Sequence, residues 1–117
     1  MRNDRPNVIV EKCVAFSIRL IRYCEVLEGN RKYVVARQLL RAGTSIGANV
    51  FEAQNAESKL DFIHKMKIAA KECSETMYWF RLCKAIEAYV FDEELEKELE
   101  VILRILSKII SSAKRKY

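Results

Sequence analysis

Apolar residues recur at alternating intervals of three and four along most of the chain, which is the pattern of helices that bury one face. Between polar breaks, the pattern predicts four helices, over about residues 7–28, 33–54, 59–90 and 93–115. The connections between these helices are short, so consecutive helices should run antiparallel. We therefore predict one all-α domain over residues 1–117, folded as an antiparallel up-down-up-down four-helix bundle.

In two of the predicted helices, further apolar residues lie beside the main seam, and in the third helix the apolar surface is wider than one neighbouring helix needs. In the first, Val14, Ile21 and Cys24 widen the main stripe, and Gly29 is a natural helix stop. In the third, a second stripe passes through Trp79, Leu82, Ile86 and Tyr89. Because a wide apolar face is typical of interaction surfaces, we predict an oligomer interface at Trp79, Leu82 and Ile86.

The stretch from Gln38 to Ala53 has the composition of a loop and the periodicity of a helix. Its seam is predicted to pass through Val35, Leu39, Ala42, Ile46, Asn49 and Ala53. A helix-turn-helix with its turn at Gly43 would interrupt this rhythm, but the rhythm continues. Small residues here predict close helix packing. Polar contacts that fix the bundle's register are predicted at Ser45, Asn49, Glu52 and Glu72.

Charge adds a candidate surface. The chain has 21 Lys and Arg residues against 16 Asp and Glu, a formal net charge of +5, which makes nucleic acid or an acidic protein a plausible partner. The candidate phosphate contacts are Arg31, Lys32, Arg37, Arg41, Lys114, Arg115 and Lys116. Arg37 and Arg41 stand one turn apart on one helix face. The bundle topology would also gather Arg2, Arg5 and Lys59 near the basic tail.

The sequence holds no pattern that indicates catalysis. Its single histidine, His64, lacks the Glu-x-x-His motifs of di-iron bundles, and the four cysteines match no zinc spacing. We therefore predict no enzyme, no catalytic residue, no metal, no cofactor and no small-molecule substrate. The cysteines are expected to be free buried thiols in a cytoplasmic chain. Neither a signal peptide nor a membrane span is predicted.

The central segment resembles a known family. The resemblance rests on these residues: Gln38, Leu39, Arg41, Ala42, Ser45, Ile46, Asn49, Val50, Glu52, Ala53, Ser58, Asp61, Phe62, Ala69, Lys71, Glu72, Glu75 and Trp79. This pattern is similar to that of the four helix bundle proteins related to the 23S rRNA intervening-sequence protein. The same family includes the accessory variability determinant protein of diversity-generating retroelements.

The resemblance implies an antiparallel bundle that assembles as a ring-like homopentamer and is not an enzyme. The retroelement relative binds nucleic acid and its reverse transcriptase, so RNA or DNA and a reverse transcriptase are implied as possible partners. Two functional hypotheses remain open. One is a homo-oligomer whose basic surface binds RNA or DNA non-specifically. The other is a protein-interaction scaffold with no nucleic-acid role.

Overall fold

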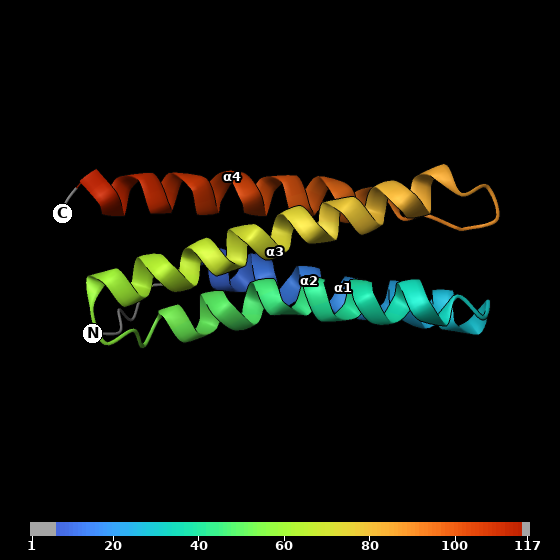
Figure 1. The fold of residues 1–117 in the computed structure, drawn as a ribbon, viewed down its shortest axis with the longest axis horizontal. Coiled ribbons are helices and arrows are strands. Elements are labelled where there is room, and N and C mark those ends of the chain that lie inside the picture. Colours follow the sequence, from blue (N-terminus) through green and yellow to red (C-terminus); the bar gives the residue numbers. More distant parts are fainter. Residues whose placement is uncertain (1–6, 116–117) are drawn as a thin grey trace.

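The computed structural model describes residues 7–115, in which four helices lie lengthwise beside one another (Figure 1). They are α1 (Val8–Gly29), α2 (Tyr33–Ala53), α3 (Lys59–Ala85) and α4 (Glu93–Arg115). α1 packs against α2 and α4, and α3 packs against the same two helices. The described residues contain no β-strand, which confirms the predicted all-α class. Arg2, Arg5 and Lys116 lie outside the described residues.

Capping side chains define where the helices begin. Asn7 accepts a hydrogen bond from the Val10 N–H at the start of α1, and Ser58 accepts one from Asp61 at the start of α3. Asp92 accepts the Glu94 N–H at the start of α4. Because consecutive helices run in opposite directions, one end of the molecule holds the start of α1, the end of α2, the start of α3 and the end of α4 (Figure 1).

The core is a continuous apolar seam shared by all four helices. Its largest fully buried side chains include Phe16, Leu20, Leu39, Phe80 and Leu99. All four cysteines are buried and free, and burial raises the pKa of Cys13 to about 11. These thiols behave as small apolar side chains of the core, as predicted.

α2 is continuous through Gly43, so the helix-turn-helix alternative is excluded. Its buried face differs slightly from the predicted seam, because Val35 and Asn49 are only half-buried while Val50 is fully buried. A Cβ atom at Gly43 would run into the Leu20 side chain of α1, and one at Gly47 would lie 3.2 Å from the Cys13 Cβ. The small residues of α2 thus let α1 approach closely.

α3 ends at Ala85, five residues before the predicted end. Ile86 is extended, with φ −85° and ψ 111°, and Val90 is 60% exposed instead of continuing the seam. Phe91 turns back into the core, where its ring packs edge-on against Phe80 at a centroid distance of 5.3 Å. Burying this aromatic side chain stabilises a loop where periodicity alone predicted another helical turn.

The turn between α1 and α2 also differs from the sequence prediction. Gly29 is the last helical residue, and Arg31 instead adopts the left-handed conformation with φ 64°. The Lys32 N–H bonds back to the Leu27 carbonyl at 2.8 Å, the long-range bond of a Schellman-type helix end. The first helix therefore ends one residue later than expected. The left-handed position that glycine usually favours is taken by Arg31, two residues after Gly29.

Candidate functional site

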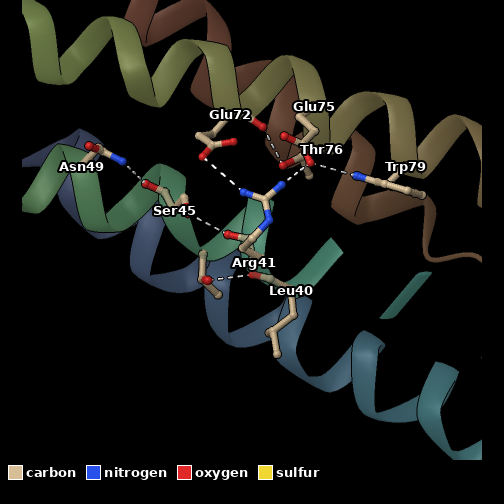
Figure 2. Close-up of polar contacts among 9 residues, drawn as sticks. Leu40, Arg41, Ser45, Asn49, Glu72, Glu75, Thr76 and Trp79 are labelled. Carbon is tan, nitrogen blue, oxygen red and sulfur yellow. Dashed lines mark hydrogen bonds and ion pairs between the residues drawn. The ribbon is translucent and has the colours of Figure 1, made fainter. Parts of the chain in front are cut away.

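The middle of the α2–α3 boundary holds a polar network around Arg41 (Figure 2). The Arg41 guanidinium pairs with Glu75 and lies 3.6 Å from the Glu72 carboxylate. Trp79 donates its indole N–H to the same Glu75 carboxylate at 3.2 Å. Arg41, followed by Trp79, holds the pKa of Glu75 below its usual value. Arg41 thus connects α2 to α3 rather than pointing away from the bundle.

The other polar residues of α2 mostly bond to their own helix. Ser45 donates to the Arg41 carbonyl at 2.7 Å, and the Asn49 side chain donates to the Ser45 carbonyl at 2.8 Å (Figure 2). Glu52 is exposed, 3.9 Å from Lys65 on α3. Of the predicted structural polar residues, Glu72 makes the closer interhelical contact, with Arg41. The hydrogen bonds of Ser45 and Asn49 stay within α2, and a role for these two residues in the register of the bundle stays a prediction.

The predicted oligomer-interface residues have different environments. Trp79 and Leu82 are half-buried, and Trp79 packs against the core as well as contacting Glu75. Ile86 is 41% exposed and lies beyond the end of α3. These three residues therefore do not lie on one continuous helix face.

The predicted phosphate contacts fall at opposite ends of the bundle. Arg31, Lys32 and Arg37 lie at the α1–α2 turn and the first turns of α2, where Lys32 Nζ stands 5.3 Å from the Tyr89 ring centroid. Lys114 and Arg115 lie at the end of α4, about a helix length away. In one copy of the chain, a ligand could contact both groups only if it extended along the length of the bundle.

A basic surface spans the end of α4 and the first half of α3. Residues 62–71 and 101–115 contain no Asp or Glu. We call their exposed basic residues the basic end surface: Lys67, Lys71, Arg104, Lys108, Lys114 and Arg115. Lys67 lies against Lys114 across the α3–α4 boundary. A hydrogen bond from Lys67, which only a neutral Lys114 amine can accept, and then the like charge of Lys67 lower the pKa of Lys114.

Two basic residues outside the basic end surface are instead paired with carboxylates. Arg19 pairs with Asp92 at 2.8 Å, and Lys84 pairs with Glu96 at 2.9 Å. Both carboxylates belong to the acid-rich region at the start of α4, in which residues 92–100 carry six acids. The charge of the α3–α4 half thus changes sign along its length. The sequence signal for this surface is the run of fifteen residues without an acid, 101–115, together with the acid-free run 62–71 in α3.

No side-chain group suited to metal binding is found among residues 7–115. They hold no cluster of three or more His, Cys, Asp or Glu side chains placed to share a metal ion. Within the same residues, no buried side-chain nitrogen or oxygen is left without a hydrogen-bond partner. None of the helices described is long and apolar enough to cross a membrane.

Comparison with known proteins agrees with this helical architecture. A search of curated protein sequences finds no match. Among solved structures, the chain is similar to a protein of unknown function from the S23 ribosomal protein family of Bacteroides thetaiotaomicron. The two share 37% sequence identity with a TM-score of 0.83, over 87% of this chain and 97% of that one. The profile of the 23S rRNA-intervening sequence proteins also matches residues 5–112, and the chain belongs to that family.

Proposed function

We propose that this protein is a non-enzymatic accessory protein that binds RNA or DNA through phosphate contacts made by the basic end surface. The observation that carries the proposal is the contact between Lys67 and Lys114, which sets two basic side chains together between two runs, residues 62–71 and 101–115, that contain no Asp or Glu. Such a pair costs free energy unless an anion lies beside it. A phosphate backbone supplies repeated anions without requiring any base-specific contact.

Arg41 is not part of the proposed surface, because its guanidinium is already paired with two glutamates. Arg31, Lys32 and Arg37 form a second, separate basic region at the other end of the bundle. A long nucleic acid following the molecule could reach both regions, whereas a short one would contact only the basic end surface.

The test is fluorescence anisotropy with labelled RNA and DNA oligonucleotides across a salt series. Because binding that neutralises phosphates releases counterions, affinity should fall steeply as salt rises from about 50 to 200 mM. RNA and DNA of the same length should bind alike if the contacts are to phosphate. Absence of binding at the lowest salt would refute the proposal.

A second candidate function is self-association, and a specific apolar patch favours it. The patch lies in the groove between α1 and α2 beside Gly47, a hollow of about 420 Å³. Val14, Ile18 and Phe51 line it and are 46%, 47% and 54% exposed. Val14 was predicted to face the core, but it points into this groove. We call Val14, Ile18 and Phe51 the α1–α2 patch and propose it as a contact between copies of the chain.

Light scattering tests self-association and the location of the contact. Wild-type protein should be an oligomer, and a pentamer if the family resemblance extends to assembly. Phe51→Asp should shift it to a smaller species, since a charge in an apolar interface must be desolvated. Ile86→Asp, which alters the interface predicted from sequence, should leave the mass unchanged. A monomeric wild-type protein at micromolar concentration would exclude this candidate.

A further inference from the structure

An apolar groove lies between the first turns of α3 and the last turns of α4. Phe62 from α3 and Ile105 and Ile109 from α4 line it, and all three are half-buried against the core. The groove encloses about 470 Å³, and every described residue that lines it belongs to α3 or α4. Phe62 and Ile109 pack against the buried core beneath them, so this is the edge of the core that stays partly open.

The charges around this groove are all of one sign. Lys59 and Lys108 line it, together with the Ser112 hydroxyl group, and no carboxylate is among its described lining residues. The nearest acid in sequence, Asp61, accepts the Glu57 N–H at 3.1 Å and lies 3.7 Å from Lys65. Lys108 also belongs to the basic end surface, so the apolar groove opens directly onto that surface.

We infer that this groove receives an unstacked base of single-stranded nucleic acid while Lys59, Lys108 and the basic end surface hold the flanking phosphates. The inference rests on the proposed function and adds the class of nucleic acid. Aromatic and apolar side chains beside a positively charged track are the usual elements of single-strand binding. A duplex keeps its bases stacked inside, so it would contact the lysines and leave Phe62 unused.

The experiment compares a single-stranded 20-nucleotide RNA with its duplex at one salt concentration. The wild-type protein should bind the single strand about tenfold more tightly, the effect of one buried base. Phe62→Ala should lower single-strand affinity to the duplex value and leave duplex affinity unchanged. Tyr78→Ala is the matched control, because it removes an exposed aromatic ring from the same helix, sixteen residues beyond Phe62 and outside the groove.

Photocrosslinking of the wild-type protein gives a second reading that does not depend on a variant's folding. A single-stranded oligonucleotide containing 5-iodouracil should crosslink to the peptides around Phe62 or Ile109. Crosslinks confined to other helices would overturn the inference.

The remaining outcomes separate this inference from the proposed function. If neither RNA binds, both fail. If single strand and duplex bind equally, the phosphate-binding function stands and the base-binding groove is refuted. If polyglutamate displaces the single strand as readily as unlabelled RNA does, the surface recognises only negative charge, and the groove assignment is again overturned.

Discussion

At the level of single residues, Arg41 joins α2 to α3 by pairing with Glu72 and Glu75 on the facing helix (Figure 2). The sequence placed Arg41 on the outer side of its helix together with Arg37. Helical periodicity gives the angle of a side chain around its own axis but does not say where the neighbouring helix stands. The pairing of Arg41 with α3 therefore required the three-dimensional packing.

This pairing lowers the pKa of Glu75, and the titration of Glu75 can be followed by tryptophan fluorescence. Trp79 is the only tryptophan of the chain, and it donates a hydrogen bond to the Glu75 carboxylate. Its fluorescence should therefore change as Glu75 becomes protonated, with a midpoint below the ordinary glutamate value of about 4.3. Arg41→Met should move the midpoint upward.

The lowered pKa of Glu75 also makes the stability of the folded protein depend on pH. A depressed folded-state pKa contributes stability that is present above the unfolded pKa and is lost as pH falls through the folded pKa. Arg41→Met should thus reduce stability at neutral pH and leave the stability at very low pH nearly unchanged. Equal fluorescence midpoints in the two proteins would show that Arg41 does not set the Glu75 pKa.

At the level of helices, the sequence predicted the existence and order of all four elements correctly because their apolar periodicity is strong. The errors lie where a tertiary contact overrides a local pattern. α3 stops early and the loop after it packs the half-buried Phe91 ring against Phe80, and the apolar residues Val14 and Ile21 of α1 remain 46% and 41% exposed. Periodicity marks such residues as apolar, but only the position of α2 shows that they lie outside the seam.

The close contact of α1 with α2 gives a stability prediction. Gly43→Ala places a methyl group against the buried Leu20 side chain, so it should destabilise the protein by about 1–3 kcal/mol. Gly29→Ala is the control, because a Cβ there meets nothing within 4 Å and its φ is not positive. That change should stabilise the protein by up to about 1 kcal/mol. Urea unfolding of both variants tests the prediction, and equal effects would argue against close packing at Gly43.

At the level of the whole molecule, charge is distributed unevenly along the α3–α4 half. Acids gather at the start of α4 and pair with Arg19 and Lys84, while toward the other end residues 62–71 and 101–115 carry basic residues and no acid. The sequence predicted that Lys114 and Arg115 would lie at the end where α3 begins, which the helix arrangement confirms. It did not identify Lys67, because the face of α3 that meets α4 depends on how the bundle turns.

The most direct test of the proposed surface compares two neutralised lysines of α4 in RNA binding. Lys114→Gln removes one member of the close pair, so it should weaken binding and reduce the slope of log K against log salt by about 1. Its melting temperature should not fall, because the change relieves repulsion from Lys67. Lys97→Gln, the same substitution in the acid-rich half of the helix, should leave both affinity and slope unchanged. Equal losses in the two variants, or no loss in either, would contradict the assignment of nucleic-acid binding to the basic end surface.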